Sequence, residues 1–517
     1  MMRQSYRLIW NSIAIWGLRV LRVIPQLFLL PFIIHRLGES LYGIYILAWS
    51  IIPVLDLLQG GIASGIVKYS AQFLRNKEID KVNRILSNAC LMTGTLGFLG
   101  GGFILFITTF IPGWLESISA ENAQQLKLAC NIVGLAIITS FPIMPYAGIL
   151  HSLQRYDIYN LIKVLFAYIQ VGVIVSWFLI FSPSFEVLVI ASGISYFLSN
   201  LFLVFIAYKI VPGLSNSSKY YHTGAFKLLL GFGSVMFLCN ICLVINTSGI
   251  RWMMGILVSP AFVGVLAIIT KPAQLIQQIV QAMSLSVMPA ASKYFADKDI
   301  KTLSELLVRG TRYIVLVLIV GMMSVLLMTK SVLKIWMGAE YQYLTVYVIL
   351  LCTSTSILLS SSCAHHMLRG MGMLRASLMS AAIGPVFITV GLIGGLLKLD
   401  ISPYYAVTIG LSAGYVFSAI LKNFYCLRKL GNSMLSFYWL AYGQGLIVAV
   451  PVFLIFWLVS NIFWNDALMA NLLISFIAIL TFIIVFVLIF ATTKEKEMTK
   501  RIISKVFMLL FKKRYAK

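Results

Sequence analysis

Long apolar segments follow one another along the whole chain and constrain its fold more than any other feature. Of its 517 residues, 60% are hydrophobic and only 11% are charged, which is typical of a membrane protein. A helix needs about 20 apolar residues to cross a bilayer, and hydropathy predicts about fourteen segments of that length. Their approximate limits are 10–34, 41–66, 86–111, 126–149, 159–182, 186–209, 228–250, 261–290, 312–337, 343–367, 374–397, 402–426, 434–462 and 466–491. We therefore predict an all-α polytopic membrane protein.

Basic residues alternate from side to side between these segments. If the N-terminus is cytoplasmic, most of the 40 lysines and arginines fall in cytoplasmic connections, Lys163 and Lys422 among them, and both termini lie in the cytoplasm. Only Arg19, Arg22 and Lys271 are then left in mid-span. The net charge of +24 thus indicates topology and attraction to anionic lipid headgroups, and we expect no nucleic-acid partner.

Two stretches of the chain resemble each other and indicate an internal repeat. YGIYILAWSIIPVLDLL, which begins at Tyr42, and VGVLAIITKPAQLIQQI, which begins at Val263, both have a glycine at the second position. An apolar run, a proline and polar residues follow in each. The pattern predicts two pseudo-symmetric six-helix lobes and two appended helices, as in many transporters. The predicted parts are 1–212, 213–430, the appended helices 431–493 and a basic cytoplasmic tail 494–517.

The connections between spans are short, which argues against an enzyme. No G-x-x-x-x-G-K-[ST] motif occurs, so the sequence offers no ATP-binding loop, and we expect no cofactor. Cys239 and Cys242 form a C-x-x-C inside a predicted span, where packing is the expected role. The pair His365–His366 is interpreted as interfacial and not as a metal site.

Arginine in the first span points to a bound anion. An arginine at the centre of a spanning helix costs about 2.5–3.5 kcal/mol on insertion scales. Arg19 and Arg22 are three residues apart and so share one helical face. Together with Lys271 they leave the membrane interior net positive, because Asp56 is the only mid-span acid. Arginine suits bidentate phosphate recognition. Asp56 either pairs with an arginine and holds helices together or couples transport to an ion.

Amide side chains extend this polar interior along two further spans. Asn240 and Arg251 lie on the seventh span, and Gln274 and Gln278 follow Lys271 on one face of the eighth. Such a stripe faces a wet cavity or another helix, and amides suit sugar hydroxyls. The predicted ligand-binding residues are Arg19, Arg22, Lys271, Arg251, Asn240, Gln274 and Gln278.

The runs LGESLYGIYILAWSIIPVLDLLQGGIASGIVKYSAQF from Leu37, RNKEIDKVNRILSNA from Arg75 and GILHSLQRYDIYNLI from Gly148 resemble the polysaccharide-transport family. These are the Wzx-type flippases of lipid-linked oligosaccharides, within the multidrug/oligosaccharidyl-lipid/polysaccharide exporter superfamily. The resemblance extends over essentially the whole chain. It implies a central cationic cavity lined by first-helix arginines, a position that Arg19 and Arg22 match, with Lys271 as the basic residue of the second lobe.

The same resemblance implies a function in the cell inner membrane. Such a protein moves a polyprenyl-pyrophosphate-linked glycan, such as an O-antigen, capsule or exopolysaccharide unit, from the cytoplasmic to the outer face by alternating access. Its expected partners are that glycan lipid, membrane lipid, a glycan polymerase and a chain-length regulator. Two alternatives stay open: a multidrug or cation antiporter of the same superfamily, and a membrane glycan polymerase. The first needs acidic cavity residues and the second needs long outer loops with carboxylates.

Overall fold

The computed structural model describes residues 2–110, 119–230, 241–284, 286–463 and 468–491. The side chains of residues 2–17 and of Arg19 lie outside the described part, as do Cys239, Asn240 and the tail 494–517. Nearly all described residues are helical, and no strand occurs among them. The predicted all-α fold is confirmed.

Twelve helices in the described residues are long and apolar enough to cross a membrane. They are Glu39–Arg75, Ile79–Ile107, Ala120–Ile143, Tyr156–Ile180, Phe185–Ile210, Pro260–Gln281, Ile300–Trp336, Ala339–Gly370, Leu374–Lys398, Pro403–Leu430, Met434–Ser460 and Met469–Ile489. Two of the fourteen predicted segments, 10–34 and 228–250, have no counterpart among these twelve. The 36-residue helix α1 (Met2–Leu37) covers the first, and the shorter apolar helix Ile241–Leu257 overlaps the end of the second. The chain is a multi-pass membrane protein.

Two compact units divide the chain by packing. Unit 1 comprises residues 1–269 and 385–404, and unit 2 comprises 270–384 and 405–517. Unit 1 contains α1, α2 (Glu39–Trp49), α3 (Ile51–Arg75), α4 (Ile79–Ile107), α6 (Ala120–Ser140), α7 (Pro145–Ser152), α8 (Tyr156–Ile180), α9 (Phe185–Ile210), α10 (Thr223–Leu230), α12 (Ile250–Leu257) and α19 (Thr389–Lys398). Helix α13 (Pro260–Ser284) runs from unit 1 into unit 2. Unit 2 also holds α14 (Val287–Ala296), α15 (Ile300–Trp336), α16 (Thr345–Ser360), α17 (Ser362–Gly370), α18 (Leu374–Ala382), α20 (Pro403–Leu430), α21 (Met434–Tyr438), α22 (Gln444–Phe463) and α23 (Leu468–Ile489). The lobe limits expected from the repeat stay a prediction.

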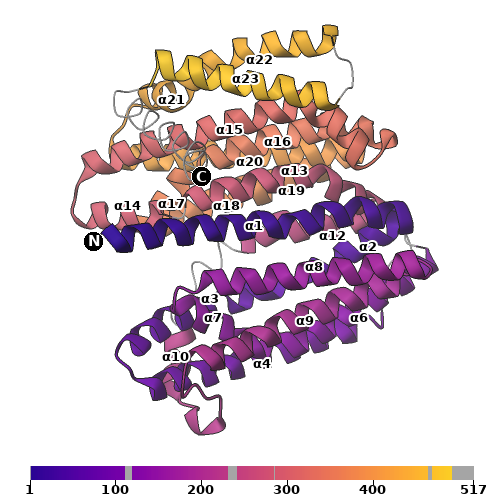
Figure 1. The fold of residues 1–517 in the computed structure, drawn as a ribbon, viewed down its shortest axis with the longest axis vertical. Coiled ribbons are helices and arrows are strands. Elements are labelled where there is room, and N and C mark those ends of the chain that lie inside the picture. Colours follow the sequence, from indigo (N-terminus) through magenta and orange to yellow (C-terminus); the bar gives the residue numbers. More distant parts are fainter. Residues whose placement is uncertain (1, 111–118, 231–240, 285, 464–467, 492–517) are drawn as a thin grey trace, which may run out of the picture. The chain divides into compact units, whose positions relative to one another are not determined.

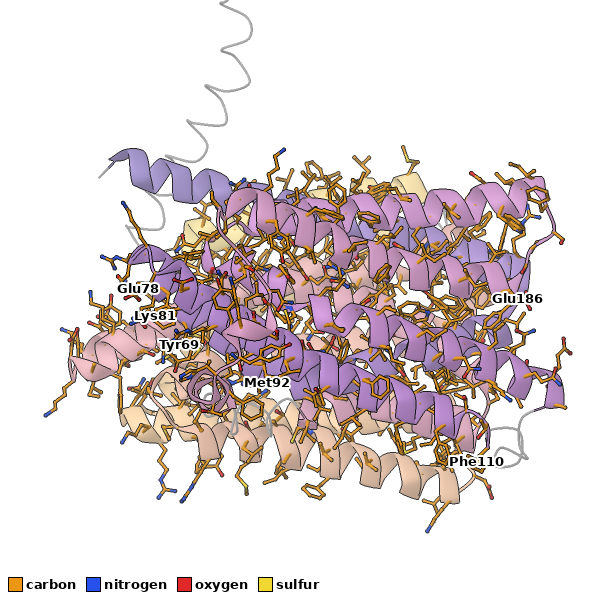
Figure 2. All side chains as sticks on the ribbon, turned by 90° about the horizontal axis from the view of Figure 1, so that it is seen from below. Tyr69, Glu78, Lys81, Met92, Phe110 and Glu186 are labelled. Atoms are coloured by element: carbon orange, nitrogen blue, oxygen red, sulfur yellow. The ribbon has the colours of Figure 1, made fainter. Side chains whose placement is uncertain are left out.

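The long helices of unit 1 pack side by side. Helix α1 contacts α8, α8 contacts α9, α9 contacts α6, and α6 contacts α4 (Figure 1). Small residues permit the closest of these approaches: a Cβ added at Gly101 would lie 2.6 Å from the carbonyl oxygen of Gly134. Figure 2 shows Glu78 and Lys81 near one end of this bundle and Phe110 and Glu186 near the other. Helix α4 therefore runs the full length of the bundle.

The two repeat glycines meet at a backbone contact between α2 and the start of α13. A Cβ added at Gly43 would collide with the carbonyl oxygen of Pro260. A Cβ added at Gly264 would collide with the carbonyl oxygen of Glu39. Both positions thus need glycine for the same reason, because each helix presents its glycine to a carbonyl of the other.

A linker segment, residues 211–222, lies along α4, and side chains of α4 form hydrogen bonds with its backbone. Asn83, Ser87 and Asn88 are buried and point from one face of α4 to this segment. The contacts are Asn83 Nδ2 to Gly213 O at 3.0 Å, Ser215 N–H to Asn83 Oδ1, Ser217 N–H to Ser87 Oγ at 3.2 Å, Asn88 Nδ2 to Tyr220 O at 3.1 Å, and His222 N–H to Asn88 Oδ1 at 3.3 Å. Five polar contacts hold a segment that has almost no regular secondary structure.

The variant Asn83→Ala should release the linker segment from α4. It removes a donor and an acceptor at once, each worth about 0.5–1.5 kcal/mol. Trypsin cleavage after Lys219, which is exposed, should become several-fold faster. Asn76→Ala is the matched control, because Asn76 is an exposed asparagine at the end of α3. Equal cleavage rates in the two variants would contradict the assignment.

Unit 2 is organised around the 37-residue helix α15. It packs against α16, α22 and α23, and α22 and α23 lie side by side (Figure 1). Buried Arg312 of α15 donates to the carbonyl oxygen of Phe490 at 2.8 Å, and its guanidinium lies 5.3 Å from the ring centre of Phe486. Asn471 of α23 donates to Ser331 at 2.8 Å. Polar as well as apolar contacts therefore join the predicted appended helices to α15.

Candidate functional site

A cavity of about 260 Å³ lies inside unit 1, between α3, α4, α7 and α8. Asp56 is the one acidic side chain among the described residues that line it. The other lining residues are Gln59, Gly60, Ala63, Ile66, Val67, Thr93, Met144, Pro145, Ala147, Gly148, His151 and Tyr159. Polar groups thus enter a largely apolar chamber at a few points, as in ligand pockets generally.

Lys163 of α8, close to this cavity, is held by two hydrogen bonds and two aromatic contacts. Its Nζ donates to Ser199 Oγ at 2.9 Å and to Asn200 Oδ1 at 2.8 Å, both on α9. The ammonium also lies 5.8 Å from the ring centre of Tyr159 and 5.9 Å from that of Tyr196. Oxygen acceptors and two aromatic faces together hold a positive charge within the bundle.

Two charged side chains from two other helices interact with Lys163. Asp56 of α3 and Lys163 attract each other electrostatically, and Arg22 of α1 acts on both Lys163 and Tyr159. Asp56 Oδ1 is buried and accepts no hydrogen bond from any described residue. The cluster, defined as Arg22, Asp56 and Lys163, thus holds two basic residues and one acid, and its formal charge is positive, with Arg22 at its exposed side.

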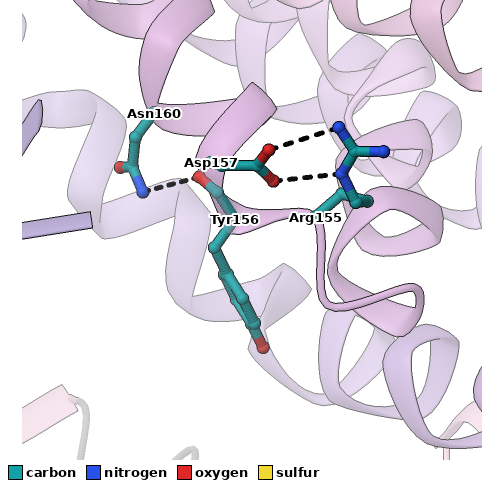
Figure 3. Close-up of polar contacts among 4 residues, drawn as sticks. All are labelled: Arg155, Tyr156, Asp157 and Asn160. Carbon is teal, nitrogen blue, oxygen red and sulfur yellow. Dashed lines mark hydrogen bonds and ion pairs between the residues drawn. The ribbon is translucent and has the colours of Figure 1, made fainter. Parts of the chain in front are cut away.

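The start of α8 adjoins the cavity, which Tyr159 of this helix and the nearby His151 line. Arg155 forms a two-pronged ion pair with Asp157, with N–O distances of 3.1 and 3.2 Å, and Asn160 donates to the carbonyl of Tyr156 at 2.8 Å (Figure 3). The pair is about half exposed, so it orients the helix start rather than contributing much stability. His151 stacks on Tyr156, with ring centres 4.8 Å apart. Burial lowers the pKa of His151, which favours the neutral imidazole near pH 7.

An aromatic and amide network adjoins the charged cluster. Tyr45 and Gln170 both bond Ser192 Oγ, at 3.2 and 2.7 Å. Trp49 meets Tyr196 edge-on, with ring centres 6.0 Å apart. These side chains offer stacking surfaces and hydrogen-bonding groups of the kind that recognise sugars or other polar ligands.

The predicted site residues are distributed over both units. Arg22 and Asp56 each interact electrostatically with Lys163, whereas the side chains of Arg19 and Asn240 fall outside the described part. Arg251 of α12 lies within electrostatic reach of Tyr42 on α2. Lys271 and Gln274 are half-buried and Gln278 is exposed, all on the part of α13 that belongs to unit 2. Their roles in ligand binding stay predictions.

Sequence reasoning missed Lys163 and Lys422. The charge pattern predicts cytoplasmic positions for both, but Lys163 lies within α8 and Lys422 is buried within α20, so basic residues other than Arg19, Arg22 and Lys271 also lie within the helices. One signal was available for Lys163: it falls inside the predicted span 159–182, four residues after Tyr159 and thus on the same helical face. Its oxygen partners on α9 could not be read from the local sequence.

Comparison with known proteins identifies the fold. No family model and no curated protein matches the chain. Among solved structures, the lipid II flippase MurJ in an inward closed conformation has a TM-score of 0.67 at 15% identity, covering 93% of this chain and 99% of that one. An inward-facing MATE multidrug resistance transporter of the MOP superfamily has a TM-score of 0.64 at 14% identity, covering 80% and 98%. The MATE multidrug transporter DinF-BH has a TM-score of 0.61 at 16% identity, covering 81% and 95%. The chain therefore has the fold that MATE transporters of the MOP superfamily share with the lipid II flippase MurJ.

Proposed function

We propose that this protein is a flippase that moves a polyprenyl-pyrophosphate-linked oligosaccharide from the cytoplasmic to the outer face of the inner membrane. The observation that carries the proposal is the cluster of Arg22, Asp56 and Lys163 in unit 1, whose formal charge is positive. Arginine and lysine favour phosphate oxygens, and the neighbouring amides and aromatic rings suit a glycan. The fold, shared with a lipid II flippase, supports a lipid-linked substrate.

The same proposal extends to the residues predicted from sequence. Arg19, Arg22, Arg251 and Lys271 would bind the pyrophosphate, and Asn240, Gln274 and Gln278 would bind the glycan. Asp56 would couple transport to a proton or sodium gradient, and rocking of two helix lobes would alternate access. A glycan polymerase and a chain-length regulator would take over the product at the outer face, as in O-antigen, capsule or exopolysaccharide assembly.

The variant Arg19→Ala/Arg22→Ala should slow flipping at least about tenfold, because charge-assisted hydrogen bonds are worth about 1.5–3 kcal/mol each. The assay uses proteoliposomes that contain a polyprenyl-pyrophosphate glycan and measures how fast its sugar becomes accessible to an added lectin. Arg428→Ala, which removes an exposed arginine from α20, should flip at the wild-type rate. Flipping at the wild-type rate by the double variant would remove the cationic cluster from the mechanism.

The competing candidate is a multidrug or cation exporter, which the similarity to MATE transporters favours. Such a protein needs acidic groups for cationic ligands, whereas Asp56 here is outnumbered by cations. Efflux of a fluorescent organic cation from the same proteoliposomes separates the two functions. Saturable efflux that is lost in Asp56→Asn, without any flipping of the glycan lipid, would favour the exporter.

A further inference from the structure

A second group of cationic side chains lies inside unit 2. His365, His366 and Arg369 are on α17, and Lys422 is on α20. The rings of His365 and His366 are 5.4 Å apart, and both histidines as well as Lys422 interact electrostatically with Arg369. Lys422 is only 8% exposed and lies about 12 Å before the end of its helix, at about 1.5 Å per residue.

The surroundings of Lys422 differ from those of Lys163. Lys163 donates hydrogen bonds to Ser199 and Asn200, whereas Lys422 makes no hydrogen bond and no ion pair with any described residue. An ion pair of unit 2 joins Arg309 to Glu305, which are other residues of that unit. Lys422 is a buried residue whose ammonium lies next to other cationic groups and makes no hydrogen bond to a described residue, an arrangement that is unfavourable unless the charge is neutralised or meets an anion.

Two buried polar atoms in this region lack a partner among the described residues. They are His365 Nδ1 and Asn423 Oδ1. Asn423 follows Lys422 on α20 and donates through Nδ2 to Tyr442 at 3.3 Å, so only its oxygen is left over. His365 Nδ1 can donate to an anion, and Asn423 Oδ1 can accept from a protonated phosphate. Orphaned groups beside a buried lysine indicate that a polar ligand completes the site.

The N–H donors of this group indicate which kind of ligand it would bind. Lysine supplies three N–H donors, arginine a planar fork and histidine ring N–H groups, a set that matches the several oxygens of a phosphate. His366 and Arg369 are half-exposed, so the group is open on one side while Lys422 is not. We propose that His365, His366, Arg369 and Lys422 form a binding site for a phosphate group in unit 2, carried either by a lipid headgroup or by a free phosphate or pyrophosphate.

The proposal does not depend on the proposed function, because it concerns other residues in another unit. It adds a binding site for an anion to the chain, whatever substrate the cluster of unit 1 serves. If both hold, the protein has two phosphate-binding sites, and loss of the first by substitution of Arg22 leaves the second intact.

The test measures binding to the full-length protein in detergent by calorimetry, with sodium pyrophosphate and inorganic phosphate as the soluble probes. Lipid nanodiscs of phosphatidic acid, compared with phosphatidylcholine, provide the lipid probe and are analysed by native mass spectrometry. Arg22→Ala is included in every series to report on the unit 1 cluster separately. Wild-type protein should bind one of the two phosphate sources saturably, and binding should weaken with added salt.

Lys422→Gln should weaken that binding at least about tenfold, whereas Lys422→Arg should keep it within a few-fold because the charge is preserved. Arg428→Gln removes one positive charge from an exposed position of the same helix and is the matched control. His366→Gln is the second variant should Lys422→Gln fail to fold, and it too should weaken binding. Binding of the soluble probes alone would identify the ligand as a free phosphate or pyrophosphate, and binding of phosphatidic acid alone would identify it as a lipid headgroup. Absence of saturable binding to either, or equal binding by Lys422→Gln and Arg428→Gln, would overturn the site.

Discussion

Lys163→Met is expected to lower the free energy of unfolding by about 1–3 kcal/mol, the range for leaving buried polar groups without partners. The substitution keeps a long apolar stem but strips Ser199 and Asn200 of their cationic donor. It also removes the positive charge that attracts Asp56. The thermal midpoint of the purified protein should fall accordingly, and flipping of the proposed glycan-lipid substrate should be lost.

A second substitution separates the loss of the hydrogen bonds to Ser199 and Asn200 from the loss of the attraction to Asp56. Asp56→Asn in the Lys163→Met background removes the carboxylate that has lost its counter-charge, so part of the stability should return. Lys209→Met is the matched control, because Lys209 is exposed near the end of α9. If Lys163→Met and Lys209→Met melt at the same temperature, the hydrogen bonds of Lys163 do not stabilise unit 1.

Gly43→Ala and Gly264→Ala are each expected to destabilise the protein by about 1–3 kcal/mol, the usual range for overpacking. In each case the new methyl group would meet a backbone carbonyl, of Pro260 or of Glu39, and a backbone oxygen cannot move aside as a flexible side chain can. The helices α2 and α13 would have to separate at this point. The measurement is again the thermal midpoint of the purified protein.

The double variant tests whether the two glycines serve one contact. Once the first methyl group has pushed the helices apart, the second should meet less resistance, so the combined loss should be smaller than the sum. Gly172→Ala on α8 is the control, because a Cβ there meets nothing within 4 Å. This control should be neutral or slightly stabilising, since alanine favours a helix by about 0.5–1 kcal/mol over glycine. Additive losses at Gly43 and Gly264 would mean two independent sites.

The spans were accessible from the sequence because they depend on local composition. Apolar runs of spanning length must become helices in a bilayer, where every backbone polar group needs an internal partner. The matching glycines of the repeat, Gly43 and Gly264, were visible as a pattern. That they face each other's helix across one backbone contact was not, because they lie far apart in the chain.

The polar interior was only partly predictable. Arg22 and Asp56 stood out because charge within an apolar segment is rare. Lys163 and Lys422 lie close to helix ends rich in basic residues, so a rule that counts basic residues by side placed them in solvent. Depth within a helix bundle depends on neighbouring helices, and no count of residues in one segment supplies it.

By itself, the sequence determined that this protein is an all-helical membrane protein with basic residues in its spans. Only the tertiary structure decided which of those cations the protein itself satisfies. Lys163 meets Asn200, 37 residues away on the next helix, whereas Lys422 meets no acceptor among the described residues. The physical reason is that a buried charge is stabilised by groups within a few ångströms, and packing of distant segments determines which groups those are.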